Sequence, residues 1–370
     1  MTVEVALAES GVKVTTLTTD DDGPGRRYKG DGQPKPAPGV NRVYCPKRSE
    51  FYKFAPYLAF WLWRNVSKFD VVHIHALFSF SSTVAGFIAA MRGVPYVVRP
   101  LGTLNSYGVM QRRRWLKRLS IALIERHILK RAAAVHFTSE SEQQEAQALG
   151  LTMRPVVIPL GISPVAPGKA DVLRQAYPSV AGRAVILFLS RLDPKKNLEG
   201  LLRAHASFPQ PRPALIIAGD GEREYVRSLK SLAVSLGLEN DLIWLGHVTG
   251  EMKAAAFAAA DIFALPSFSE NFGIAVAEAM LAGLPVVVGR GVAIAGEIET
   301  AGGGIAVDPD PQSIRSGLSR LLADPALRRR MGERARAHAQ DAYSTTAMAK
   351  RLIELYAHVR LRSSAQPSDA

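Results

Sequence analysis

The chain has 370 residues, of which 47% are hydrophobic, and this length favours two domains that each bury a sizeable core. The composition excludes a disordered protein. The single cysteine, Cys45, excludes a disulfide framework and a cysteine-based zinc site, and it suits a reducing compartment.

The formal charge of +13 indicates an anionic partner, which is a nucleic acid, a membrane surface or a phosphorylated substrate. Nucleic acid is the least favoured of the three, because no nucleic-acid fold signature accompanies the charge. The first residues, "MTVEVALAES", lack the pattern of a signal peptide. No segment approaches the roughly 18 apolar residues of a membrane span. We therefore expect a cytoplasmic protein.

The N-terminal half contains candidate strands with helical stretches between most of them. The candidate strands are "VKVTTLT" (12–18), "DVVHIHA" (70–76), "PYVVR" (95–99), "AAVHFTS" (133–139) and "RPVVIP" (154–159). A Gly/Pro-rich stretch, 22–39, indicates a loop, and the proline-bearing stretch 160–169 indicates a linker between two halves.

Two basic or aromatic segments of this half suit a membrane surface. Residues 48–69 carry Phe51, Phe54, Tyr57, Leu58, Trp61 and Leu62 at helical spacings, with Pro56 dividing the segment into two short helices. The run "QRRRWLKR" (111–118) adds dense positive charge. Aromatic and cationic residues together favour peripheral attachment to an anionic bilayer. The alternative is that the aromatic residues fill the core and the charges are solvated.

The C-terminal half alternates cleanly between apolar strands and helices. The expected strands are 184–190, 214–219, 241–246, 261–266 and 285–289. Strands that are apolar throughout are typical of a parallel sheet covered by helices on both faces. We therefore predict an α/β protein with two doubly wound parallel sheets that face each other across a cleft. The expected domains are 1–163 and 164–342, with a helix over 343–370 that packs back on the first domain.

Ligands of doubly wound sheets bind outside the carboxyl ends of the strands, so the functional motifs are expected in the loops that follow strands. The loop "SRLDPKKN" (190–197) follows a buried strand and enters a helix. Arg191 offers a fork of donors and Lys196 a mobile point charge, and at a helix N-terminus the pair predicts a diphosphate site. The alternative is a solvated basic loop, which we prefer for Lys195.

The stretch "SFSENFGIAVAEAMLAGLPVVVG" (267–289) places two carboxylates around a helix N-terminus. Ser269 or Asn271 could cap that helix, and Gly273 would let the backbone approach a ligand. The N–H groups of 272–275 predict a phosphate or sugar-hydroxyl site. Glu270 suits sugar hydroxyls or positive charge at a sugar carbon. Glu278 suits ribose hydroxyls, because a carboxylate on a helix apolar nearly all round needs a partner.

"SRLDPKKN" followed by "ENFGIAVAE", with "GDG" (219–221) and "GLPVV" (283–287), resembles the retaining glycosyltransferases of family 4, which have the GT-B fold. The resemblance covers roughly 184–309. It implies that Arg191 and Lys196 grip the donor diphosphate, that Glu278 binds ribose and that Glu270 lies by the transferred sugar. The predicted donor-binding residues are Arg191, Lys196, Gly219, Asn271, Phe272, Gly273, Ile274 and Glu278, and the predicted catalytic residues are His75 and Glu270.

The N-terminal half resembles the acceptor domain of the same family more loosely. His73 and His75 share one strand face, being two residues apart. His75 is nearer the carboxyl end and would hold a donor-sugar hydroxyl or position the acceptor, while His73 is expected in the core. Arg99 or Asn105 could contact the acceptor. Family members usually begin with a strand and a glycine loop, which this sequence lacks, so a gap is expected in the first sheet.

The predicted activity is therefore sugar transfer from a nucleotide diphosphate sugar to a hydroxyl acceptor, with retention, in cell-envelope or exopolysaccharide biosynthesis. The acceptor is expected to be lipid-linked, at the inner face of a membrane. No Asp-x-Asp pair stands in a plausible position, so no metal or other cofactor is expected. The alternatives are a catalytically impaired nucleotide-sugar binder, an epimerase or phosphorylase of the same fold, and a nucleic-acid-binding protein.

Overall fold

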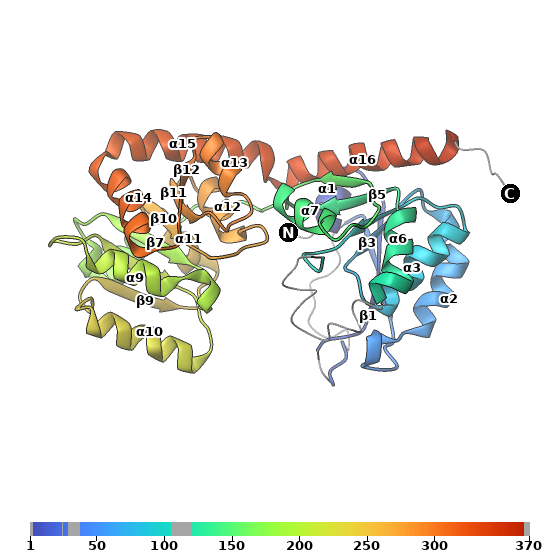
Figure 1. Cartoon of the computed structure of the whole chain (residues 1–370), viewed down its shortest axis with the longest axis horizontal. Helices are drawn as coiled ribbons and strands as arrows, with labels where there is room; N and C mark the ends of the chain where they lie inside the picture. The colour runs from blue at the N-terminus through green and yellow to red at the C-terminus, as the bar shows by residue number, and fades with distance from the viewer. Residues whose placement is uncertain (1–2, 24, 29–37, 105–119, 366–370) are drawn as a thin grey trace. The chain divides into compact units, whose positions relative to one another are not determined.

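The computed structural model describes residues 3–23, 25–28, 38–104 and 120–365 (Figure 1). The chain forms two compact units, one made of Met1–Gly161 with Thr345–Ala370 and the other of Ile162–Ser344. No helix in the described part of the chain combines the length and the apolar character needed to cross a bilayer.

The N-terminal unit is built on parallel strands. Its strands are β1 (Val14–Thr19), β2 (Val40–Cys45), β3 (Val72–His75), β4 (Tyr96–Arg99), β5 (Ala134–Phe137) and β6 (Pro155–Val157). Its helices are α1 (Val3–Glu9), α2 (Pro56–Asn65), α3 (Phe80–Met91), α6 (Arg126–Arg131), α7 (Glu140–Gln147) and α16 (Thr345–Ala365). Short helical turns cover Phe51–Lys53, Val66–Lys68 and Ile121–Glu125.

Helices cover both faces of the sheet β3-β4-β5-β6. Side chains alternate along a strand, so Val97 and Val98 point to opposite faces. Val97 packs with Ala134 and with Val359 of α16. Val98 belongs to the larger core that includes residues of α2, α3 and α6. Figure 1 shows α16 lying along this unit, although the helix is the last of the chain.

The expected gap in the first sheet is present among the described residues. β1 and β2 pair in parallel as a separate two-stranded sheet, and β3 forms the edge of the four-stranded sheet. Strand β2 was not predicted, because "VNRVYC" follows a Gly/Pro-rich stretch and its two consecutive polar residues, Asn41 and Arg42, interrupt the alternation expected of a half-buried strand.

The aromatic segment 48–69 differs from its predicted surface. Helix α2 begins at Pro56, so the proline does divide the segment. The prediction was wrong for Leu58 and Leu62, which are 1% and 6% exposed and belong to the core. Helix α2 carries apolar residues almost all round, and its other face is the exposed one. The sequence therefore does not show which side of α2 is buried. In the structure, Leu58 and Leu62 share a core with Ile88 and Ala89 of the neighbouring helix α3.

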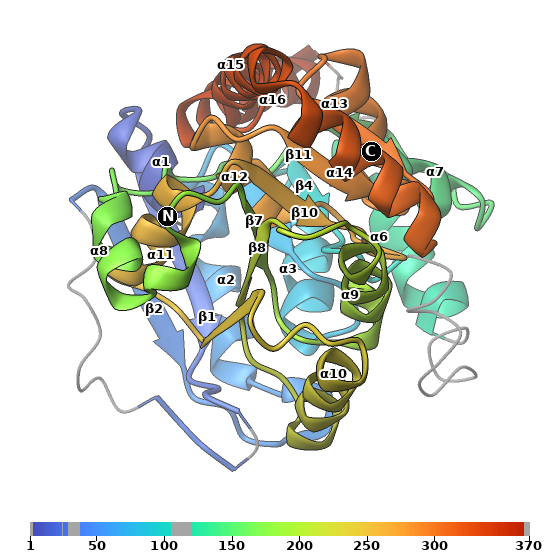
Figure 2. The same cartoon turned by 90° about the vertical axis from the view of Figure 1, so that its left-hand side faces the viewer.

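The C-terminal unit is a single six-stranded parallel sheet with helices on both faces. Its strands are β7 (Val185–Leu189), β8 (Ala214–Ala218), β9 (Leu242–Gly246), β10 (Ile262–Leu265), β11 (Val286–Gly289) and β12 (Gly304–Val307). Its helices are α8 (Ala170–Ala176), α9 (Leu198–Ala206), α10 (Arg223–Ser235), α11 (Gly250–Ala259), α12 (Ile274–Leu281), α13 (Ala295–Thr300), α14 (Pro311–Ala323) and α15 (Pro325–Ala342). In Figure 2, α8 and α11 lie on one side of the sheet and α9 and α14 on the other.

The strand order β9-β8-β7-β10-β11-β12 reverses direction between β7 and β10. This is the doubly wound order, and its ligands bind where the order reverses, outside the carboxyl ends of the strands. The loop after β7 contains Arg191 and Lys196, and the loop after β10 contains Glu270. The topology therefore brings the two motifs of the sequence to one place.

Candidate functional site

The loop after β7 presents Lys196 toward Glu270. Asp193 caps the 3₁₀ turn Pro194–Lys196 by accepting from the Lys195 N–H at 3.0 Å, and Asn197 then caps helix α9. The Lys196 ammonium forms an ion pair with Glu270, and both side chains are mostly buried, at 14% and 17% exposed. Both residues were predicted at the site, but their ion pair was not.

Arg191 is placed differently from Lys196. Its side chain is 74% exposed, and its Nη2 lies 3.6 Å from an Asp193 carboxylate oxygen. Exposed ion pairs contribute little stability, so Arg191 is a largely solvated cation of this loop. Lys196 is thus the stronger candidate for holding a phosphate charge.

Burial, together with the positive charges of Arg191 and Lys195, lowers the pKa of Lys196 to about 8. The paired Glu270 carboxylate favours the charged ammonium and acts in the opposite direction. Lys196 is therefore positively charged at neutral pH, and it loses that charge more readily than an exposed lysine as the pH rises.

The backbone of the loop after β7 packs closely against Gly219, which directly follows β8. Its φ of 147° and the position of the Ser190 carbonyl, whose oxygen would lie 1.8 Å from an added Cβ, both require glycine. The neighbouring Gly221 forms a bridge with Leu192. Glycine here lets the loops after β7 and β8 lie against each other and fixes the chain that leads to Lys196.

Gly219→Ala should lower nucleotide affinity at least tenfold and lower the melting temperature by several degrees, because the methyl group displaces Ser190 and the loop that follows it. Thermal unfolding and nucleotide titration measure both effects. Gly237→Ala is the matched control, because Gly237 also has a positive φ but meets no atom within 4 Å. Equal losses in the two variants would show that the close approach to Ser190 is unimportant.

The N-terminus of α12 lies in the loop after β10. The predicted caps are wrong: Gly273, with φ 93°, is the N-cap, and no side chain caps the helix. Ile274 is 52% exposed at the first helical position. The ring of Phe272 is buried against Tyr343, with centroids 5.3 Å apart, so only its backbone can face a ligand. Asn271 is exposed, two residues before the glycine.

Glu278 has a partner that sequence analysis missed. Its carboxylate accepts a hydrogen bond at 2.7 Å from the ammonium of Lys253, on the first turn of α11. Both side chains are mostly buried, at 26% exposed for Lys253 and 15% for Glu278. The signal for Lys253 was available, because it is the only basic residue in the alanine-rich stretch "EMKAAAFAAA". The pair fixes the carboxylate and leaves its second oxygen for a ligand hydroxyl.

His75 lies in the N-terminal unit, unlike Glu270 and the predicted donor-binding residues. It ends β3 with an exposed side chain. Desolvation of the imidazole ring by the surrounding protein, and then the positive charge of Arg99, lower the pKa of His75 to about 4. His73 is half-buried and its Nδ1 lies 2.6 Å from the Tyr356 hydroxyl, which fits the expected core histidine. The predicted acceptor contact Asn105 lies outside the described residues.

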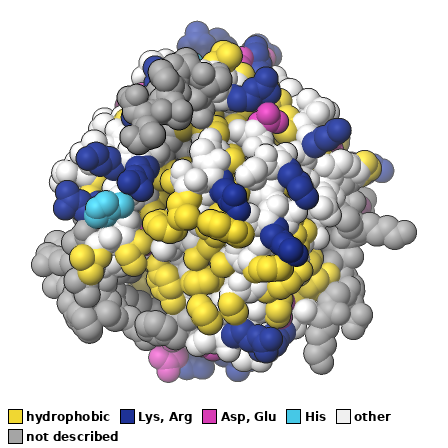
Figure 3. Space-filling view, turned by 90° about the vertical axis from the view of Figure 1, so that its right-hand side faces the viewer, with side chains coloured by type: hydrophobic (Ala, Val, Ile, Leu, Met, Phe, Trp, Pro, Cys, Tyr) yellow, Lys and Arg dark blue, Asp and Glu magenta, His cyan; other side chains and the backbone are white. Residues whose placement is uncertain are grey.

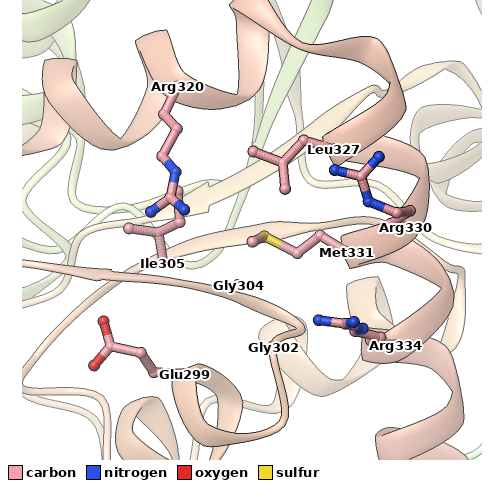
Figure 4. A pocket seen from close by; sticks show the side chains of 9 residues that line it. All are labelled: Glu299, Gly302, Gly304, Ile305, Arg320, Leu327, Arg330, Met331 and Arg334. Atoms are coloured by element: carbon pink, nitrogen blue, oxygen red, sulfur yellow. The ribbon is translucent and has the colours of Figure 1, made fainter.

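One pocket of the C-terminal unit lies away from these residues (Figure 4). It has a volume of about 260 Å³, and Glu299, Arg320, Arg330, Arg334 and Met331 are among its lining residues. Gly304 and Ile305 line it from the beginning of β12, whereas the predicted donor residues follow the ends of strands. Its three arginines are exposed, so their charges are solvated and do not define a site. Among the described residues, no group of three or more His, Cys, Asp or Glu side chains is arranged to hold a metal ion.

Comparison with known families accounts for most of the chain. The family described as "Glycosyl transferases group 1" matches residues 170–338, and "Glycosyl transferase 4-like domain" matches residues 3–161. The first match contains the Lys196–Glu270 and Lys253–Glu278 pairs. The chain belongs to the family 4-like glycosyltransferases.

Individual relatives agree with this assignment. A D-inositol 3-phosphate glycosyltransferase from Corynebacterium efficiens is 34% identical over 179 residues, which cover 46% of this chain and 42% of that protein. The chain thus spans about half the length of the curated relatives it matches.

Solved structures show the GT-B fold of this chain. Sucrose-phosphate synthase from Thermosynechococcus elongatus is similar with a TM-score of 0.73 and 22% identity, over 97% of this chain and 92% of that one. HepE from Anabaena, in complex with UDP, is similar with a TM-score of 0.73 and 20% identity, over 94% and 100%. The predicted α/β fold class is confirmed.

Proposed function

We propose that the protein transfers a sugar from a nucleoside diphosphate sugar to a hydroxyl acceptor, with retention of anomeric configuration. The observation that carries the proposal is the Lys196–Glu270 ion pair at the point where the strand order reverses. A cation for a diphosphate and a carboxylate for a sugar are there in direct contact. We further propose a role in cell-envelope or exopolysaccharide biosynthesis.

Charge on the departing diphosphate would be balanced by the protein. Lys196 provides a mostly buried cation, Arg191 an exposed one, and the N-terminus of α12 a partial positive charge. These groups act without a metal, and we propose metal-independent transfer. Turnover in excess EDTA should therefore equal turnover in magnesium, and a strict requirement for a divalent ion would contradict the proposal.

The carboxylates would divide the donor between them. Glu270 gives up its contact with Lys196 when the diphosphate arrives, and its oxygens then serve sugar hydroxyls or the positive charge that develops at the anomeric carbon. Glu278, held by Lys253, accepts from ribose hydroxyls. We propose that His75, neutral because of its lowered pKa, holds a donor-sugar hydroxyl or positions the acceptor.

A donor screen with UDP-, GDP- and ADP-sugars, followed by analysis of the product linkage, tests the function. UDP-sugars come first, because HepE was crystallised with UDP and, separately, with UDP-glucose. Sugar transfer with the anomeric configuration retained is the expected result. Binding of a donor without turnover would support the alternative of a catalytically impaired nucleotide-sugar binder. A failure of every donor to bind would overturn both.

The N-terminal unit carries a surface suited to an anionic bilayer, here called the aromatic–arginine surface. It consists of Tyr57, Phe60, Trp63 and Arg64 of α2, Phe87 and Met91 of α3, and Arg92. The five apolar side chains are 45–59% exposed. Arg92 stacks on Trp63 at 4.0 Å from the ring centroid, and Arg64 lies 5.0 Å from that of Phe60.

Figure 3 shows hydrophobic side chains gathered on the face of this unit where α2 and α3 lie, with lysines and arginines among them. Exposed aromatic rings next to arginines suit the interfacial layer of a bilayer with anionic headgroups. We propose peripheral membrane attachment through this surface, with a lipid-linked acceptor presented there. The basic run 111–118 lies outside the described residues.

Binding to anionic vesicles should depend on the aromatic–arginine surface. Each arginine near an anionic leaflet contributes about 1 kcal/mol, so Arg64→Gln with Arg92→Gln should weaken binding about 25-fold. Tyr57→Ser, Phe60→Ser and Trp63→Ser together should reduce it further. Sedimentation with phosphatidylglycerol vesicles measures the effect.

Val234→Ser is the control for these variants, because it removes an exposed apolar side chain (57% exposed) from the C-terminal unit. Neutralising Arg112, Arg113, Arg114 and Lys117 should also abolish pelleting. If the parent protein stays in the supernatant, or if pelleting survives in all surface variants, the membrane proposal is wrong.

A further inference from the structure

Arg99, the last residue of β4, is a buried cation. The residue is 6% exposed, and its Nε is buried without a hydrogen-bond partner. Among the residues that the structure describes, no carboxylate forms an ion pair with it. A buried guanidinium in this state is unfavourable unless an anion completes its surroundings.

The carboxylates of the neighbourhood are bound to other groups. Glu142 is the carboxylate whose negative charge acts on Arg99. Its Oε1 accepts from the Gly102 N–H at 2.7 Å, and its Oε2 accepts from the N–H and the hydroxyl of Thr138, both at 2.8 Å. Glu4, which lies near His75, accepts from Arg42 and Thr16. Neither is available as a close partner of Arg99.

Strand pairing places three histidines on the same sheet face as Arg99. His75 on β3 is the register partner of Arg99, and His73 lies two residues before His75 on the same strand. His136 lies on β5, the neighbour of β4 on its other side. His136 Nδ1 lies 3.4 Å from His73 Nε2, and its Nε2 lies 2.8 Å from the Ile158 carbonyl oxygen. Burial lowers the pKa of His73 and His136, and the charge of Arg99 adds to the effect, so both rings are neutral. Arg99 is thus the cation of this cluster.

The backbone around Arg99 is strained in the loops that follow the strands. Ala76, Phe78 and Leu101 have φ values of 73°, 58° and 57°, a region that residues other than glycine rarely adopt. All three lie directly after β3 or β4. Such residues cluster at functional sites, and the carboxyl ends of parallel strands are where ligands bind.

We propose that Arg99 binds an oxyanion carried by the acceptor, so that the acceptor is an acidic molecule, with His75 as a neutral hydrogen-bonding group beside it. A planar guanidinium suits the paired oxygens of a phosphate ester or a carboxylate. This inference rests on the proposed transfer reaction for the word acceptor, but the oxyanion site itself stands on Arg99 and its surroundings. It assigns Arg99 to substrate selection, whereas Lys196 serves the donor.

The first test measures binding of inorganic phosphate by calorimetry, with UDP present in excess to occupy the donor site. Arg99→Gln should weaken phosphate binding at least tenfold and leave UDP affinity unchanged. Arg126→Gln is the matched control, because Arg126 is an exposed arginine of the same unit. Phosphate binding that is equal in Arg99→Gln and the parent overturns the inference. Failure of UDP to bind, with phosphate binding still dependent on Arg99, would instead overturn the donor function alone.

Thermal unfolding separates a binding role of Arg99 from a structural one. In phosphate-free buffer, Arg99→Gln should melt at or above the temperature of the parent, because it removes an uncompensated buried charge; Arg99→Met provides a second test of the same point. A clear drop in melting temperature in both variants would mean that Arg99 is structural.

Comparison of glucose, glucose 6-phosphate and glucuronate as competing ligands then distinguishes phosphate from carboxylate. Equal binding of all three would overturn the proposal.

Discussion

Replacing Lys196 with methionine should weaken binding of a nucleoside diphosphate about 10- to 150-fold. A charge-assisted hydrogen bond is worth about 1.5–3 kcal/mol, and the change also leaves Glu270 unpaired beside the incoming phosphates. Arg191→Ala should cost about fivefold or less, because that side chain is 74% exposed. Titration with UDP measures both, and Lys195→Ala is the adjacent control. Equal losses at 191 and 196 would contradict the assignment of Lys196 as the main phosphate ligand.

The same titration should depend on pH. The diphosphate binds the protonated lysine, whose pKa is lowered to about 8, so affinity should be steady below that pH and fall as the pH rises through it. Lys196→Arg should retain its affinity above pH 8, because a guanidinium stays charged. A parent protein whose affinity is flat to pH 9.5 would show that the Glu270 carboxylate holds the lysine fully protonated.

Glu270→Gln should lower kcat about 100- to 1000-fold while nucleotide affinity stays the same or rises. The substitution preserves shape but removes the charge that stabilises a developing cation, and it also removes repulsion of the diphosphate. Steady-state kinetics and UDP titration separate the two quantities. The exposed Glu239→Gln serves as the control.

Glu278→Gln should show the opposite division, with weaker nucleotide binding and a smaller change in kcat. Lys253→Met should reproduce part of that loss, because it frees the Glu278 carboxylate from the 2.7 Å contact that orients it. If Glu270→Gln and Glu278→Gln change affinity and kcat alike, the two carboxylates do not have separate roles.

The fold could be predicted because the strands of the C-terminal unit are apolar throughout and alternate with helices. Chain order then placed the motif loops at the ends of the strands. Strand β12 (Gly304–Val307) was missed because it begins with the last glycine of the run 302–304, which leaves an apolar run of only Ile305–Val307. The exposed face of α2 was assigned wrongly because a helix with aromatic residues all round does not indicate which stripe meets its neighbour.

The site was predicted residue by residue but not as a set of contacts. Glu270 and Lys196 each stood in a recognisable loop, yet their ion pair depends on the strand order, which brings segments about 70 residues apart together. Lys253 lies on a helix that no motif marked. The special status of Arg99 could not be read from the sequence, since it follows from burial and from the absence of a close carboxylate among the described residues.

The packing of α16 also determines the order in which the two units can be completed during synthesis. Met348 and Leu352 of α16 share a small core with Ala6 and Leu7 of α1, so the N-terminal unit needs residues from both ends of the sequence. The C-terminal unit is continuous, Ile162–Ser344, and has left the ribosome before α16 emerges. The unit that is made first is therefore finished last, and until then α1 exposes apolar side chains for which a chaperone can compete.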